Sequence, residues 1–363
     1  MQSDKSSLSW DKQLFFKKAD FFKFLMFVIM IYKHTLNYRV YPITENAGFW
    51  GGLLFGVEKL ELAVSGFISP VYFFISGFSF FLDYTPDKAP GKLKRRVFTL
   101  LIPWLLWNTI TWALWILLEG IPAISAHINS DFGYEFSLSS WFFDALLGSA
   151  DGPMWFIRNL IVAVLLAPLL YYVLKNKVAG IIVILCGYAI VLLTRVGCYS
   201  VAVTVLFFAE AGYLAIHMPS LAMRRYGKGL RIGAVCMMLV YFLFFSSQKI
   251  QNIGILHVLD YSVFFPAFWV AVDDIGLGPR AKAMEKHRFW VYASHYIPLE
   301  CVEKLWLILA GTSVLAAYVD FFLAPVVTSA LLILLSVCLE KICHPLWCLL
   351  SGKRIKKRRM EAA

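Results

Sequence analysis

Long apolar segments separated by short polar ones set the pattern of this chain. Windows of roughly 17–25 apolar residues predict membrane-crossing helices. We expect one domain of transmembrane helices over residues 1–340 and a polybasic cytoplasmic tail over 341–363. The pattern thus predicts an all-α, polytopic integral membrane protein with about ten transmembrane helices, near residues 21–43, 62–82, 97–118, 153–174, 179–194, 200–217, 232–247, 254–271, 289–310 and 318–340.

The distribution of basic residues tests this helix count independently. With the N-terminus placed in the cytoplasm, 26 of the 34 Lys and Arg residues fall in segments predicted to lie inside, and four in those outside. Because basic residues favour cytoplasmic loops, the alternation supports ten helices with both termini cytoplasmic. Topology also accounts for the net charge of +11, so we expect no nucleic-acid partner.

These features predict a multi-pass protein of the cell membrane, either the bacterial inner membrane or a plasma membrane, in contact with membrane lipids. No cleavage site follows the first apolar run, so that helix is expected to be retained. The seven cysteines show no paired framework and are expected to be small buried hydrophobes, with no metal site. The acidic outside segment 119–151 ends in residues 137–149, which predict an interfacial or re-entrant helix, or else a plain surface loop.

The helix over residues 21–43 carries Lys23 and His34 on one face. Eleven residues at ~100° each return the helix to nearly the same direction, ~16 Å further along its axis. A charged residue at the centre of a bilayer costs ~2.5–3.5 kcal/mol, so this face should turn toward protein or water. The pair is therefore a candidate functional site, although Lys23 could snorkel to the interface and His34 could simply pack. Lys33 is rotated ~100° away and is expected to lie outside the site.

Further candidates lie on other predicted helices. Ser76 belongs to a segment whose small residues allow helices to approach closely. Arg95 and Arg96 stand at a cytoplasmic mouth, where they follow either the ordinary topological bias or a phosphate-binding role. Arg158 begins an apolar helix and needs a carboxylate, a carbonyl or a ligand, unless it snorkels outward. The ninth predicted helix adds Tyr292 and His295.

Together these motifs resemble the membrane acyltransferase family 3, which O-acylates cell-envelope and other carbohydrates. Five family patterns occur in family order across most of the chain. Lys23 replaces the usual arginine, so the charge is kept and the guanidinium fork is lost. Thr99 stands where a second arginine often precedes helix three. The matching residues are Lys23 and His34; Phe73, Phe74, Ser76 and Gly77; Arg95, Arg96, Pro103 and Trp104; Trp155, Phe156, Leu160 and Pro168; and Tyr292 and His295.

The resemblance implies an O-acetyltransferase, an enzyme that transfers an acyl group other than aminoacyl, with acetyl-CoA or another acyl-CoA as co-substrate. The acceptor is a carbohydrate hydroxyl, free or lipid-linked. A histidine away from water stays neutral and can serve as the general base, which is the role we assign to His34. The other expected roles are cofactor binding by Lys23, Arg95 and Arg96, and substrate binding by Trp155, Arg158, Tyr292, His295 and Ser76.

Two other functions are compatible with the same residues. Ten helices with buried Lys, His and Arg suit a transporter or flippase for a sugar or lipid-linked glycan. Against this, no internal repeat and no pair of broken helices is visible in the sequence. A sensor or assembly subunit that keeps the fold without catalysis is a second alternative, because Lys23 departs from the family pattern. Neither the oligomeric state nor the acceptor follows from the sequence.

Overall fold

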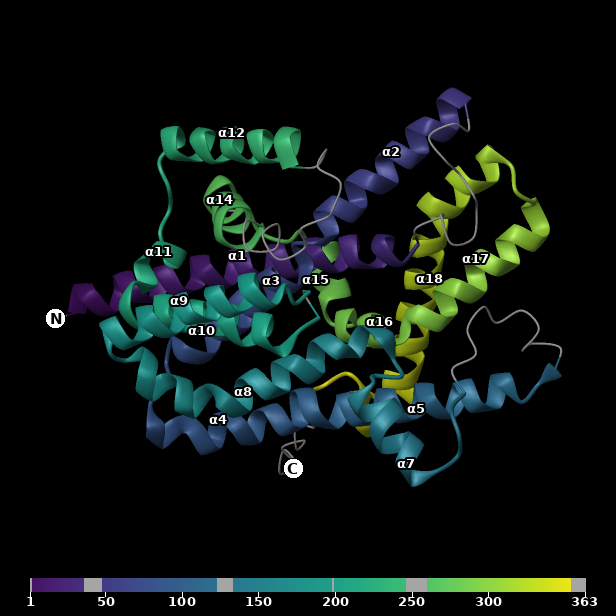
Figure 1. The fold of residues 1–363 in the computed structure, drawn as a ribbon, viewed down its shortest axis with the longest axis horizontal. Coiled ribbons are helices and arrows are strands. Elements are labelled where there is room, and N and C mark those ends of the chain that lie inside the picture. The colour runs from purple at the N-terminus through teal and green to yellow at the C-terminus, as the bar shows by residue number, and fades with distance from the viewer. Residues whose placement is uncertain are drawn as a thin grey trace, which may run out of the picture.

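A computed structural model describes residues 2–35, 48–122, 133–197, 199–245, 260–273 and 275–353. Within these ranges every regular element is helical, which confirms the all-α prediction for this part of the chain (Figure 1). Short π-helical segments occupy Val97–Leu101, Trp141–Leu147 and Asp260–Phe264, and 3-10 turns occupy Pro86–Lys88 and Gly152–Met154. The α-helices are α1 (Gln2–His34), α2 (Gly48–Ser65), α3 (Ile68–Phe81), α4 (Ala89–Arg96), α5 (Ile102–Glu119), α7 (Leu138–Ser140), α8 (Trp155–Leu174), α9 (Lys177–Thr194), α10 (Val201–His217), α11 (Pro219–Met223), α12 (Lys228–Phe245), α14 (Phe265–Ala271), α15 (Pro279–Glu285), α16 (Arg288–Ser294), α17 (Tyr296–Ala310), α18 (Val314–Ile342) and α19 (His344–Leu350).

Four helical stretches among the described residues are long and apolar enough to cross a membrane by length and composition. They are Pro86–Glu119, Gly152–Leu174, Lys177–Thr194 and Val314–Ile342. Shorter apolar helices occupy Ile68–Phe81, Leu138–Leu147, Val201–His217 and Ser262–Ala271. The number of ten spans and the cytoplasmic position of both termini stay predictions.

Breaks divide two of the helices that the sequence predicts as continuous. The predicted helix over 289–310 is interrupted at His295, between α16 and α17. The predicted helix over 62–82 is divided between α2 and α3. No helix is predicted between residues 43 and 62, but α2 begins there at Gly48 and buries Leu54 and Glu58 one turn apart. Residues 36–47, which complete the first predicted helix, lie outside the described residues.

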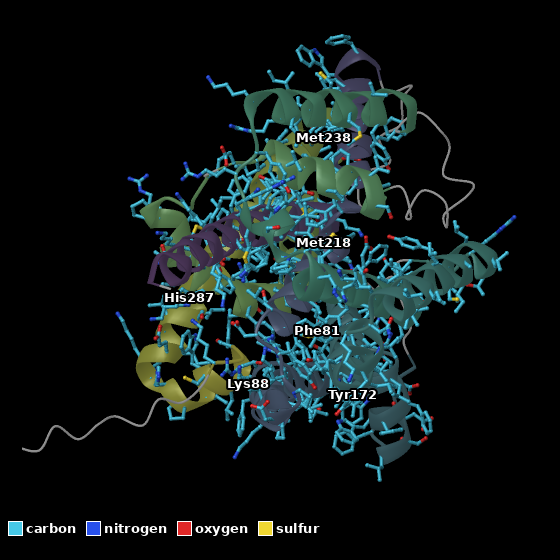
Figure 2. The ribbon with its side chains drawn as sticks, turned by 90° about the vertical axis from the view of Figure 1, so that its left-hand side faces the viewer. Phe81, Lys88, Tyr172, Met218, Met238 and His287 are labelled. Carbon is cyan, nitrogen blue, oxygen red and sulfur yellow. The ribbon has the colours of Figure 1, made fainter. Side chains whose placement is uncertain are left out.

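The most extensive helix packing in the described residues is that of α3 against α10, which lie in the same region of the ribbon (Figure 1). A Cβ added at Gly77 on α3 would lie 2.5 Å from the carbonyl oxygen of Phe208 on α10. A Cβ added at Gly212 on α10 would likewise lie 2.4 Å from the Cδ2 atom of the Phe81 ring. Phe81 is buried and lies among the packed side chains of the interior (Figure 2). The small residues therefore allow the helix approach that the sequence predicts.

Several peripheral predictions can also be compared with the structure. The helix expected within residues 137–149 is present over Leu138–Leu147, whereas residues 123–132 lie outside the described part. At the C-terminus, α19 packs against α5, and residues 354–363 of the predicted polybasic tail are outside the described residues. Of the six cysteines in the described residues, only Cys348 is buried. The expectation of burial is wrong for the others because a membrane helix can turn apolar side chains toward lipid as well as inward.

Candidate active site

A cavity of about 240 Å³ lies where the C-terminal half of α1 meets α3, α4, α8 and α16. We call it the His34 cavity. Six of the nine residues that the sequence predicts for the site line it, from five elements far apart in the chain. These six are Lys23, His34, Ser76, Arg96, Trp155 and Tyr292.

The first helix places its ionisable residues as the spacing predicts, with one addition. Lys23 and His34 both line the cavity, as their predicted placement on one helix face leads us to expect. The Lys23 side chain forms an ion pair with Asp20 at 2.7 Å, and its backbone carbonyl accepts a 2.6 Å hydrogen bond from the Tyr72 hydroxyl. The prediction that Lys33 lies outside the site is wrong, because Lys33 also lines the cavity. A long lysine side chain in the last helical turn can curve around the ~100° that separates it from His34.

Three of the predicted residues lie outside the cavity lining. Arg95 is exposed, although it neighbours Arg96. Arg158 donates to the backbone carbonyl of Leu147, so it ties α8 to the Leu138–Leu147 helix. Its Nε also lies 3.3 Å from Oδ1 of the adjacent Asn159. Arg158 therefore has the carbonyl partner that its place in an apolar helix requires, and that partner lies away from the cavity.

His295 lies directly beside His34. The two imidazole rings have centroids 5.0 Å apart, and His295 is fully buried at the break between α16 and α17. Its Nδ1 is 2.8 Å from the Tyr292 carbonyl oxygen, which can only accept, so Nδ1 carries the proton. Nε2 is then an acceptor, and it has no hydrogen-bond partner among the described residues.

The electrostatic character of the cavity is strongly basic. Four cationic side chains line it, those of Lys23, Lys33, Arg96 and Arg288, and none of the described lining residues is Asp or Glu. A narrow site lined by charges of one sign concentrates ligands of the opposite sign. The cavity is therefore suited to an anionic ligand. The prediction from sequence omitted Arg288, whose only signal was its position at the start of an apolar helix with Tyr292 one turn further on.

Aromatic side chains form the rest of the wall. Tyr292 donates from its hydroxyl to the Pro153 carbonyl oxygen at 2.6 Å, which joins α16 to the start of α8. The Trp155 and Tyr199 rings meet edge to face with centroids 4.6 Å apart, and Phe156 lies against Tyr72. The cavity thus combines a basic region with rigid aromatic surfaces.

Comparison with known proteins places the chain in a family. A family model described as an acyltransferase domain, Acyl_transf_3, matches residues 16–341, nearly the whole chain. The chain belongs to this acyltransferase family. This confirms the resemblance predicted from the sequence. Members of the family are membrane proteins, which agrees with the apolar helices described above. No curated protein and no solved structure matches the chain.

Proposed function

We propose that this acyltransferase transfers an acyl group, expected to be acetyl, from acyl-CoA to a carbohydrate hydroxyl at the cell membrane, with His34 as the general base. One observation carries the proposal. A single cavity holds His34 together with basic side chains and aromatic surfaces, and its described lining has no carboxylate. An anionic thioester carrier and a neutral sugar are the two kinds of substrate that such a lining suits.

In the proposed reaction a ring nitrogen of His34 accepts the proton of the sugar hydroxyl as its oxygen attacks the thioester carbonyl. A tetrahedral intermediate forms, the carbon–sulfur bond breaks, and the imidazolium returns its proton to the departing thiolate. The products are the ester and free CoA. General-base assistance of this kind contributes roughly 10²–10⁴-fold to the rate.

His295 supports this cycle as a positioning residue. With its proton fixed on Nδ1 by the Tyr292 carbonyl, Nε2 can accept a hydrogen bond. The rings are close enough for His34 to use that acceptor while it carries the extra proton. A partner that steadies the protonated base is the arrangement seen in catalytic triads generally.

The two ends of the cavity divide the proposed substrates between them. Lys23 and Arg288 lie near Asp20 and Glu285, on segments that the charge pattern assigns to the cytoplasmic side, where acyl-CoA is available. Trp155 and Tyr199 form the aromatic part, and flat rings pack well on the apolar faces of sugars. The acceptor is therefore assigned to the Trp155 end.

The decisive experiment compares purified wild-type protein with the His34→Ala variant, using labelled acetyl-CoA and glycans from cells that lack the gene. We expect the wild type to bind, slowly hydrolyse or transfer the label, and the variant to lose transfer while it still inserts and purifies. His344→Ala, which changes a half-exposed histidine on α19, is the matched control. Normal transfer by His34→Ala would remove the proposed mechanism, and a wild type that neither binds nor cleaves acetyl-CoA would favour a carrier.

A further inference from the structure

Lys33 is the cation of the His34 cavity to which the proposed function gives no role. Arg96, another of the four lining cations, is expected to bind the donor. The remaining two have carboxylate partners, and these pairs are Lys23 with Asp20 and Arg288 with Glu285. Lys33 therefore differs from the other three, and it directly precedes the proposed base in the sequence.

The position of Lys33 is at the end of the cavity that holds the base. It lies ten residues beyond Lys23 on α1, which at 1.5 Å per residue is ~15 Å along the helix axis. The end of α2 borders the same part of the cavity. Ser65 on its last turn lines the cavity, and Glu61, one turn earlier, interacts electrostatically with Lys33.

Glu61 is an acidic neighbour of Lys33, but the two side chains are not bonded. Within the described part of the chain neither carboxyl oxygen of Glu61 has a hydrogen-bond partner. Burial raises the pKa of this carboxyl to about 8, while Lys33 opposes the rise and Glu58 adds to it. Glu61 therefore keeps its proton at neutral pH, and it leaves the positive charge of Lys33 uncompensated.

An ammonium group in such a cavity favours a ligand that brings a negative charge. A charged group away from bulk water is destabilising unless it is paired, and an ionisable group at membrane depth is therefore expected to have a partner. The described lining of the cavity has no carboxylate that could compete for this place. Attraction between opposite charges is also stronger in a narrow cavity than at an exposed surface.

The acceptor, and not the acyl donor, is the substrate that can place an anion here. The charges of acyl-CoA are on phosphate groups far from its thioester, and the expected acetyl group is uncharged. The acceptor hydroxyl must contact His34, and the Cα atoms of Lys33 and His34 are only ~3.8 Å apart. An anionic group that reaches Lys33 thus lies close to the reacting hydroxyl, on the same sugar ring or the next one.

We infer that Lys33 makes this enzyme selective for an acidic acceptor, a carbohydrate with a carboxylate or phosphate group close to the hydroxyl that is acylated. The ammonium group binds that anion and thereby directs one hydroxyl toward His34. The inference rests on the proposed function and deepens it by naming the class of acceptor. Lys33 determines specificity in this scheme, and the chemical step is left to His34.

The test measures transfer from labelled acetyl-CoA to glycans from cells that lack the gene, after anion exchange has divided them into neutral and anionic fractions. We expect the wild type to label the anionic fraction. Amidation of carboxylates or enzymatic removal of phosphates should abolish this labelling, and the treatment that does so identifies the anion. Equal labelling of both fractions, or labelling that survives both treatments, would overturn the inference.

Variants of Lys33 show whether this side chain provides the selectivity. Lys33→Met should raise the KM for the anionic fraction by roughly tenfold or more, as for loss of a hydrogen bond to a charged group. Lys33→Arg keeps the charge and should stay close to wild type. Lys59→Met is the matched control, because this exposed lysine of α2 lies over the Phe55 ring and outside the described lining. An unchanged KM in Lys33→Met would contradict the inference.

The two kinetic constants separate selectivity from a part in the chemical step. If Lys33 instead stabilised the oxyanion of the tetrahedral intermediate, Lys33→Met would lower kcat on neutral and anionic acceptors alike, and the inference would fall. Glu61→Gln replaces a protonated carboxyl by a neutral group of the same shape, so it should keep the preference for the anionic fraction. Loss of the preference in Glu61→Gln would mean that this carboxyl builds the site.

Binding measurements keep the inference separate from the proposed function. Equilibrium binding of the anionic fraction, before and after its charges are neutralised, needs no acyl transfer. Binding that requires both Lys33 and the anion supports the inference even in His34→Ala, which is expected to transfer nothing. Transfer by the wild type that ignores the anion would refute the inference and leave the proposed function standing. A wild type that does not bind the anionic fraction would refute it as well.

Discussion

Replacement of Gly77 by alanine tests the packing that holds the site together. The added Cβ would lie 2.5 Å from the Phe208 carbonyl oxygen and 3.1 Å from the Ala211 Cβ. Ordinary contacts begin near 3.4 Å, so α3 and α10 must separate by nearly 1 Å. The obstacle is backbone, which cannot rotate away as a side chain can. Overpacking of this kind costs about 1–3 kcal/mol, and it displaces Ser76 at the cavity wall.

The assay is thermal unfolding in one detergent, followed by the transfer assay on the surviving protein. We expect Gly77→Ala to lower the unfolding midpoint by a few degrees. Gly233→Ala on α12 is the matched control, since a Cβ there meets nothing within 4 Å. Alanine in a helix interior is favoured over glycine by roughly 0.5–1 kcal/mol, so the control should be neutral or stabilising. A midpoint for Gly77→Ala at or above that of Gly233→Ala would refute the close-packing argument.

Three further predictions concern single residues. Burial lowers the pKa of Lys18 to about 8, whereas in the unfolded chain this lysine keeps its proton up to about pH 10.4. Between these two pH values the unfolded state binds more protons, so the free energy of unfolding should rise with pH. Lys18→Met should flatten that rise in pH-dependent melting curves. Arg96→Ala should raise the KM for acetyl-CoA well above the effect of Arg95→Ala, because only Arg96 lines the His34 cavity; equal effects in steady-state kinetics would return both residues to a topological role. His295→Gln should lower kcat and shift the acidic limb of its pH profile while KM changes little, and a purely structural residue would leave that limb in place.

What the sequence predicted well is what a single helix determines. The spacing of Lys23 and His34 fixes their common face through the 3.6-residue period alone, and both residues do line one cavity. The all-α class likewise follows from apolar windows and needs no knowledge of the packing. The close approach at Gly77 was predictable because a glycine among bulky aromatic residues leaves a gap on the helix surface that a neighbouring helix can fill.

What the sequence could not predict depends on contacts between helices. Arg288 lines the cavity because α16 packs against α1, and no periodicity within either segment encodes that neighbour. Lys33 lines it through a long side chain that curves around the helix, which the angular position of its Cα does not reveal. The break at His295 has a similar origin. Apolar windows report only mean hydropathy, and the buried imidazole that contacts the Tyr292 carbonyl is invisible in such an average. Arg158 was assigned to substrate because its carbonyl partner, Leu147, lies on another helix.

The basic lining of the His34 cavity has a consequence for how the enzyme would be controlled. On the proposed function, the phosphates are identical in the loaded carrier, in the transition state and in the spent carrier. Attraction that is equal in all three states improves substrate affinity without speeding the chemical step. Free CoA is then held as firmly as its acylated form and competes for the same site. The transfer rate would follow the ratio of acyl-CoA to free CoA, so the enzyme would slow down as the fraction of acylated CoA in the cell falls.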